Sequence, residues 1–156
     1  MLSMDLINLG LTEREMDTLL ATKKLYGEGW PARVSTISKE LNVRPPTVEE
    51  YIDSLISKGY IEKNAGVVRL TDMGLEVVRT IERNHRVIET FLYRMGMDKD
   101  LACKNAKIMQ YHSTEEFINN LCNLLGHPSY CPHGKEIPHD SECCSRPQTL
   151  EIVLKR

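Results

Sequence analysis

The sequence lacks the hallmarks of several protein classes. No apolar run in the 156-residue sequence approaches the ~18 residues that a membrane-spanning helix needs. No basic segment precedes an apolar stretch at the start, so no secretory signal is visible. Aromatic residues make up only 6%, which argues against binding single strands by base stacking. The 20 basic and 22 acidic residues give a net charge of −2, which excludes a strongly basic nucleic-acid coat. We expect a soluble, cytoplasmic protein with no membrane partner.

Cysteine and histidine are absent from the first 84 residues and frequent after them. The five cysteines are Cys103, Cys122, Cys131, Cys143 and Cys144, and the five histidines are His85, His112, His127, His133 and His139. In a cytosolic protein such clustering indicates metal or redox chemistry rather than structural disulfides. The chain therefore divides into a front part without soft metal ligands and a back part rich in them.

The front part is predicted to contain three helices and a hairpin. Residues 12–26 form an amphipathic helix that Thr12 can cap, and residues 34–41 form a short second helix. Two prolines open a third helix over 45–58. Two strands, 60–63 and 66–70, flank a turn. This order is that of a winged helix-turn-helix, whose third helix enters the major groove of DNA.

The back part is predicted to be helical. A long helix that Thr71 or Asp72 can cap continues to about residue 93, and further helices cover 99–110 and 113–125. Residues 149–155 alternate like a strand. The predicted fold class is mainly α, with a winged helix over 1–72, a helical dimerisation and metal-binding domain over 73–144 and a tail over 145–156.

The candidate DNA contacts lie around the third helix and the hairpin. They are Arg33, Lys39, Arg44 and Lys63 toward phosphates, with Pro45, Pro46 and Thr47 toward base edges. Glu50 either faces a cytosine amino group, or the third helix binds only when it is partnered and correctly placed. Residues 1–72 hold nine basic and eleven acidic residues, a balance of −2. A single module of this kind binds weakly, so we expect double-stranded operator DNA to be bound by a homodimer.

Metal-ligand residues occur at three places in the back part. His85 and Glu89 are spaced i, i+4 on the long helix and share a face. Cys103 and His112 flank the next helix. The third place is a loop whose rigid Cys-Pro-His segment suits two ligands to one ion. The candidates in and after this loop are Cys131, His133, Cys143 and Cys144, of which we expect only one of the last two in a mononuclear site. Thiolate, imidazole and carboxylate suit Zn²⁺ or Fe²⁺, and Mn²⁺ less readily, whereas four converging thiolates suit an iron–sulfur cluster.

Five segments together resemble the diphtheria-toxin-repressor/manganese-transport-regulator family of metal-dependent transcription factors. They are Arg44-Pro45-Pro46-Thr47-Val48, Gly59-Tyr60-Ile61, Leu70-Thr71-Asp72-Met73-Gly74, the segment from Asn84 to Leu92, and the segment from Cys131 to Pro138. The resemblance implies a homodimer that binds a palindromic operator when Fe²⁺ or Mn²⁺ is bound and represses metal-uptake genes. It also implies the short form of the family, without an SH3-like third domain.

The resemblance assigns ligand roles residue by residue. His85 and Glu89 match ligand positions on the long helix, and Cys131 and His133 match the loop ligands of the second ion. Glu15 and Asp17 are candidates for the acidic ligands of the primary site. The segment from Cys103 to His112 departs from the family pattern, because Lys104 and Lys107 stand where carboxylates are expected. The primary site is therefore expected to be altered or absent.

Two alternatives remain open on the sequence. An iron–sulfur or thiol sensor would use the surplus of C-terminal cysteines, and a metal-binding interaction module would not bind DNA at all. No nucleophile–base pair, phosphate-binding glycine loop or pair of catalytic carboxylates stands out, so an enzyme is not expected.

Overall fold

The computed structural model describes residues 4–144 and contains two compact units. One unit is Leu11–Val78, and the other combines the first ten residues with the chain from Arg79 onward. The division falls inside a long helix, and the described residues before Leu11 belong to the second unit. None of the helices within residues 4–144 is long and apolar enough to cross a membrane.

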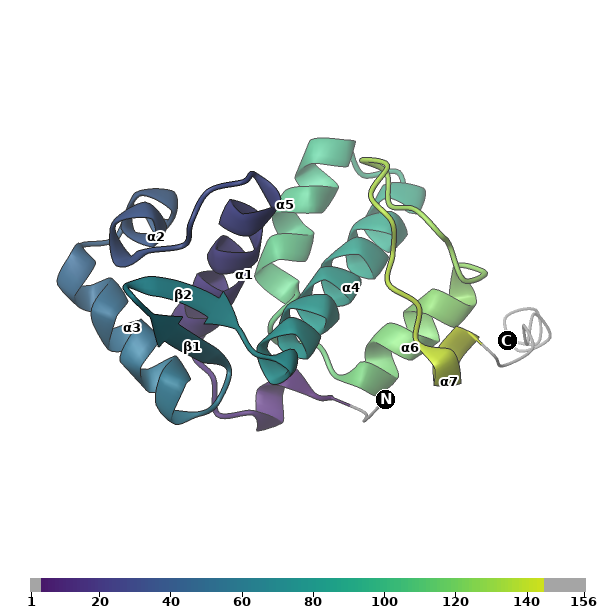
Figure 1. Cartoon of the computed structure of the whole chain (residues 1–156). Helices are drawn as coiled ribbons and strands as arrows, with labels where there is room; N and C mark the ends of the chain where they lie inside the picture. The colour runs from purple at the N-terminus through teal and green to yellow at the C-terminus, as the bar shows by residue number, and fades with distance from the viewer. Residues whose placement is uncertain (1–3, 145–156) are drawn as a thin grey trace. The chain divides into compact units, whose positions relative to one another are not determined.

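The first unit holds three helices and a hairpin (Figure 1): α1 (Glu13–Gly27), α2 (Val34–Leu41), α3 (Pro45–Ser57), β1 (Ile61–Asn64) and β2 (Val67–Leu70). A capping box starts α1, because Thr12 N donates to the Glu15 carboxylate and Glu15 N donates to Thr12 Oγ1. Asn42 ends α2 in the left-handed region at φ 53°, and prolines occupy the first positions of α3.

The hairpin is antiparallel, with Ile61 opposite Leu70 and Asn64 opposite Val67. Its turn uses Ala65 and Gly66, both with positive φ, as a tight two-residue turn requires. Val68 N also donates to Ala32 O, which attaches the hairpin to the segment before α2. Leu19, Ile37 and Ile52 are fully buried, so the three helices share one core.

The second unit is helical and contains η1 (Leu6–Asn8), α4 (Asp72–Arg94) from residue 79 onward, α5 (Lys99–Met109), α6 (Glu115–Leu124) and α7 (Ser141–Cys144). The Asp5 carboxylate accepts a hydrogen bond from Glu115 N at 2.6 Å, which ties the N-terminal segment to the start of α6.

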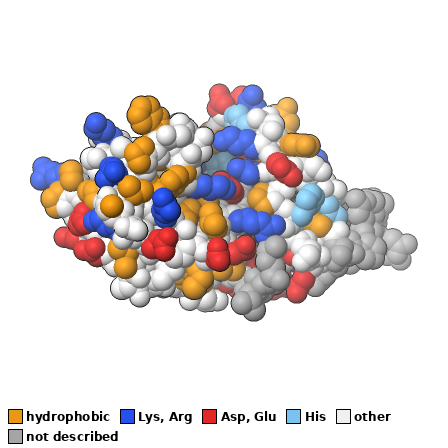
Figure 2. All heavy atoms as spheres, in the orientation of Figure 1, with side chains coloured by type: hydrophobic (Ala, Val, Ile, Leu, Met, Phe, Trp, Pro, Cys, Tyr) orange, Lys and Arg blue, Asp and Glu red, His pale blue; other side chains and the backbone are white. Residues whose placement is uncertain are grey.

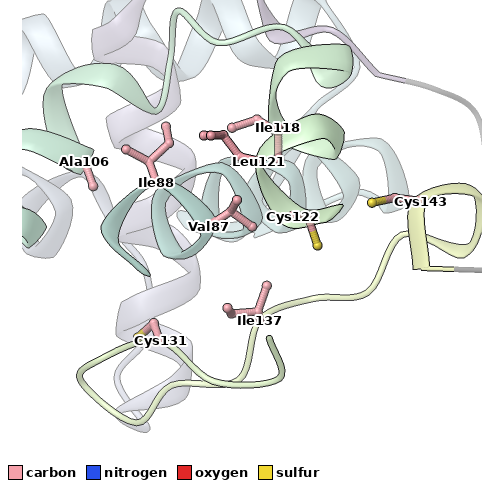
Figure 3. Packing of buried hydrophobic residues seen from close by; sticks show 9 residues of the cluster. All are labelled: Val87, Ile88, Ala106, Ile118, Leu121, Cys122, Cys131, Ile137 and Cys143. Carbon is pink, nitrogen blue, oxygen red and sulfur yellow. The ribbon is translucent and has the colours of Figure 1, made fainter. Parts of the chain in front are cut away.

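The core of the second unit joins α4, α5, α6 and the loop after them (Figure 3). It is formed by Val87, Ile88, Ala106, Ile118, Leu121, Cys122, Cys131, Ile137 and Cys143. Ile137 and Cys131 anchor the loop on the helices, so the residues between them have fixed positions relative to α4. The cysteines thus contribute to packing as well as to any chemistry.

The predicted fold class is confirmed. The observed helices and strands agree with the predicted ones to within about two residues at each end, which is the usual uncertainty of helix ends. The sequence did not predict η1, α7 or the isolated bridge between Tyr130 and Glu136. The strand expected over 149–155 lies outside the described residues.

Candidate metal centre and DNA-binding surface

Two ligand-type side chains share one face of α4. His85 and Glu89 are one turn apart, and His85 Nε2 lies 3.5 Å from Glu89 Oε2. The Glu89 residue is only 1% exposed, so its carboxylate is removed from water. A buried carboxylate needs a compensating positive charge.

The buried side chain of Gln110 sets the protonation of His85. The Gln110 Oε1 atom lies 2.8 Å from His85 Nδ1 and can only accept a hydrogen bond, so Nδ1 carries the proton. The Nε2 lone pair then faces Glu89 and the Cys103 sulfur, which lies 3.5 Å away on α5. Histidines that bind a metal through one ring nitrogen usually donate the N–H of the other to such an acceptor.

The fourth side chain comes from the loop after α6. The turn Cys131–Gly134 closes through a hydrogen bond from Gly134 N to Cys131 O, and Gly134 has φ 76°. This turn directs His133 toward α4, where its Nδ1 contacts Glu89 Oε1. Its Nε2 lies 3.3 Å from Asp100 on α5. We call His85, Glu89, Cys103 and His133 the α4 cluster.

Cys131 holds the loop in place from the buried side. Its residue is 5% exposed and belongs to the core, and Cys131 N donates to Lys135 O. Its sulfur is not among the atoms of His85, Glu89 and Cys103 that converge within 4.8 Å, although it is near enough for its charge to raise the pKa of Cys103. The structure therefore brings His133 into contact with Glu89 and places Cys131 nearby, while the ligand atoms within 4.8 Å of one another are those of His85, Glu89 and Cys103.

Burial shifts the pKa values of two members of the α4 cluster, His85 and Cys103, toward their neutral forms. Burial lowers the pKa of His85, and the hydrogen bond that His85 donates to Gln110 and the Glu89 charge only partly oppose this. Burial, followed by the Glu89 charge, raises the pKa of the Cys103 thiol. One sulfur, two imidazoles and one carboxylate are the donor set of an Fe²⁺ or Zn²⁺ site. The residues present therefore fit a divalent transition metal.

The two C-terminal cysteines do not join this cluster. The structure gathers Cys143 and Cys144 with Cys122 and His127, with one ligand atom from each within 4.8 Å of the others. Figure 3 draws Cys131 well apart from Cys122 and Cys143. The contact between α6 and α7 therefore places Cys143 and Cys144 near Cys122 rather than near Cys131. Sequence reasoning missed His127, although its spacing from Cys122 would have signalled a ligand pair.

The remaining metal candidates lie outside both groups. The Glu15 carboxylate accepts hydrogen bonds from Ser54 Oγ at 2.5 Å and Lys58 Nζ at 2.8 Å, besides capping α1. Asp17 pairs with Arg14 at 3.7 Å, and His112 is exposed on the turn after α5. Glu15 therefore stabilises the first unit, joining α1 to α3.

The predicted DNA-contacting residues are accessible at the start of α3 and on the hairpin. Arg33, Lys39, Arg44, Pro45, Pro46, Glu50 and Lys63 are exposed, and Thr47 is partly buried. The Arg33 guanidinium donates to Ala65 O in the hairpin turn at 3.2 Å, and Lys63 pairs with Glu49 of α3. In Figure 2 basic side chains stand among acidic and apolar ones over this unit, in agreement with its near-neutral charge.

Comparisons with known proteins agree with this geometry. The family described as iron dependent repressor, metal binding and dimerisation domain matches residues 71–139, and a winged helix-turn-helix family matches 28–89. An uncharacterised HTH-type transcriptional regulator of Aeropyrum pernix is 34% identical over 132 residues, which is 82% of this chain and 73% of that protein.

Two solved structures extend the comparison. A hypothetical protein of Sulfolobus solfataricus is 40% identical, with a TM-score of 0.74 over 83% of this chain and 100% of that chain. The manganese-activated repressor ScaR, in its apo form, is 30% identical with a TM-score of 0.71, over 79% of this chain and 60% of that chain. The two domains therefore have the order found in metal-responsive, DNA-binding regulators. The chain belongs to the diphtheria-toxin-repressor/manganese-transport-regulator family of metal-dependent transcriptional regulators.

Proposed function

We propose that the chain is an Fe²⁺-responsive repressor that binds a palindromic operator as a homodimer and controls metal-uptake genes. The single observation that carries the metal assignment is the convergence of the His85 Nε2 lone pair, the Cys103 sulfur and the buried Glu89 carboxylate. A cation at this point supplies the charge that Glu89 needs, and it favours the conformation in which His133 lies against α4.

The donor chemistry supports Fe²⁺ over Mn²⁺. Thiolate and imidazole ligands suit Fe²⁺ and Zn²⁺, whereas Mn²⁺ prefers oxygen ligands. In the α4 cluster the oxygen ligand is the Glu89 carboxylate. The manganese dependence of ScaR belongs to that protein, and Mn²⁺ and Zn²⁺ are the competitors to be tested here. A switch from 1:99 to 99:1 needs about 5.5 kcal/mol of differential affinity, which one well-formed site per subunit can supply.

Two observations support the dimer and the operator. Ile108 and Leu101 on α5 are 71% and 49% exposed, which is apolar surface that a second copy would cover. A homodimer would place two copies of α3 in successive major grooves, about 34 Å apart. Arg33, Lys39 and Arg44 would contact phosphates and so fix the register of α3.

The test is an anaerobic titration of the full chain with Fe²⁺, Mn²⁺ or Zn²⁺ in the presence of labelled DNA from its own promoter. Fluorescence anisotropy should show that DNA binding depends on the metal. The free Fe²⁺ concentration required for DNA binding should be lower than the free Mn²⁺ concentration required. His133→Ala should raise the required concentration by at least about 10-fold. His112→Ala, an exposed histidine outside the cluster, is the matched control and should leave the titration unchanged. Binding without metal, or an unaltered response in His133→Ala, would reject the proposal.

A further inference from the structure

The second group of ligand residues lies away from the α4 cluster. Cys122, His127, Cys143 and Cys144, which we call the thiol cluster, offer three sulfurs and one imidazole nitrogen within 4.8 Å of one another. Cys122 and Cys143 are 2% and 3% exposed, and the other two are partly buried. We propose that the thiol cluster is a structural Zn²⁺ site that fixes the C-terminal end of the described chain to α6.

The backbone after α6 directs His127 back over the helix. His127 has φ 53°, a left-handed conformation that costs about 1 kcal/mol or more in a residue other than glycine. Its N–H donates to Cys122 O at 2.9 Å, so the turn is closed on the helix. The ring Nδ1 then lies 3.5 Å from the Cys122 sulfur and 3.8 Å from the Cys143 sulfur. A metal bond to the imidazole would offset the cost of the turn.

The other two ligands come from a helix too short to be stable alone. The four residues of α7 form one turn, and isolated helices of this length do not persist in water. The Asp140 carboxylate caps it by accepting from Glu142 N at 2.8 Å, and Cys143 Sγ donates to Asn119 O on α6 at 3.5 Å. Figure 3 shows Cys122 on α6 and Cys143 on α7 facing the same space. A shared ion would supply the attachment that α7 needs.

A buried guanidinium matches the charge of such a centre. Arg83 is 6% exposed, and within the described residues its Nε and Nη2 atoms have no hydrogen-bond partner. Its charge acts on both Cys122 and Cys143. Three thiolates and Zn²⁺ carry a net charge of about −1, which one guanidinium neutralises. Burial raises the pKa of the Cys122 and Cys143 thiols, so these two sulfurs carry protons when no ion is bound.

The donor set selects zinc and a structural role. Three thiolates with one imidazole are a closed tetrahedral set that leaves no position for water, which is typical of structural zinc. The set uses both adjacent cysteines, whereas the sequence led us to expect only one of them in a mononuclear site. Both sulfurs lie within 4.8 Å of the Cys122 sulfur and the His127 nitrogen. Zn²⁺ would bind by displacing three thiol protons, with no change of oxidation state. The segment between His127 and Cys143 contains His133, so the ion would fix both ends of the loop that carries a member of the α4 cluster.

The experiment uses the full chain purified without added metal, with elemental analysis of the purified protein. We expect about one tightly held zinc per chain. The same zinc should remain in His133→Ala, in which the α4 cluster is damaged. X-ray absorption at the zinc edge should give three sulfur neighbours at about 2.3 Å and one nitrogen at about 2.0 Å. Cobalt-loaded protein should show the intense visible bands of tetrahedral thiolate coordination.

A matched pair of substitutions separates the two clusters. Cys144→Ser should lose at least about 10-fold in zinc affinity, whereas Cys103→Ser, also at a partly buried cysteine, should keep the zinc. The wild-type spectra remain informative even where Cys144→Ser fails to fold. Three results would overturn the proposal: iron together with sulfide in the purified protein, a disulfide among these cysteines, or a zinc with fewer than three sulfur neighbours. Because none of these readouts involves DNA, they are independent of the repressor assignment.

Discussion

At the scale of single residues, Gln110 controls the chemistry of the α4 cluster without belonging to it. Its carbonyl oxygen holds the proton on His85 Nδ1, so Nε2 faces the ligands. The sequence predicted His85 and Glu89 because they share a helix face, but it could not predict Gln110. That contact depends on how α4 and the end of α5 pack, which residue spacing does not encode.

We predict that Gln110→Leu weakens Fe²⁺ binding by about 10–100-fold, the usual cost of losing an outer partner of a histidine ligand. Gln110→Glu keeps an acceptor oxygen and should retain most of the affinity. Anaerobic titration with a competing chelator measures both. Equal losses in the two variants would mean that packing, not the proton position, is what Gln110 provides.

Glu15 is a second residue whose role is settled by its partners. Burial opposes its ionisation, but hydrogen bonds from Lys58, Ser54 and Thr12 outweigh this, and its pKa lies below the ordinary value of 4.5. A carboxylate whose pKa is lower in the folded than in the unfolded protein stabilises the fold at pH values above the pKa of the unfolded state. This contribution is lost as the pH falls through the pKa of the folded state.

Glu15→Gln should therefore reduce the free energy of unfolding at neutral pH by about 1–3 kcal/mol. The lower end is expected because Lys58 is partly exposed and solvent screens the pair. The difference between wild type and variant should shrink below pH 4.5. Urea unfolding at a series of pH values measures it. A difference that stays constant with pH would show that the carboxylate charge is not responsible.

At the scale of elements, the start of α4 is fitted against the hairpin with no room for a side chain. A Cβ atom on Gly74 would lie 2.1 Å from the carbonyl oxygen of Tyr60. Because this oxygen belongs to the backbone, the backbone would have to shift to remove the clash. The helix begins here because Thr71 Oγ1 accepts from Gly74 N and donates to Gly59 O. The sequence predicted the helix and its cap, but not this close approach.

Gly74→Ala should lower the free energy of unfolding by about 1–3 kcal/mol, as overpacking does. Gly27→Ala is the matched control, since a Cβ there meets nothing within 4 Å and the residue is helical. The control should be neutral or stabilising by up to about 1 kcal/mol. Chemical denaturation of the two variants compares them directly. Similar stabilities would contradict the steric argument.

The elements that the sequence missed share a physical reason. Both η1 and α7 are three or four residues long, too short to show a period, and tertiary contacts such as Asp5 with Glu115 hold them. Because α7 was not predicted, the sequence grouped Cys143 and Cys144 with the candidates of the loop and not with Cys122 and His127. The long helices were predicted because caps and apolar periods agree over many residues.

At the scale of the whole molecule, DNA binding must overcome a chain that is net negative. Lys63, on the hairpin, is paired with Glu49 of α3, so its charge is not fully available to phosphate. Affinity for DNA therefore depends on local arrangement rather than on overall charge, and it should fall with added salt.

Glu49→Gln should raise DNA affinity in the metal-loaded protein and steepen the dependence on salt by about one counterion. Arg44→Ala should have the opposite effect. Anisotropy titrations over a range of salt concentrations give both slopes. An unchanged slope in Glu49→Gln would mean that Lys63 does not contact phosphate.

The unequal exposure of Glu89 and His133 has a consequence for timing. The side chain of Glu89 is 2% exposed and that of its contact partner His133 is 29% exposed, so the imidazole is the more accessible of the two. An ion bound by Glu89 would exchange only when His133 swings away, and its residence time would be set by local opening of the loop. The rate at which the regulator responds to a fall in metal supply would then depend on the opening of this loop, independently of its metal affinity at equilibrium.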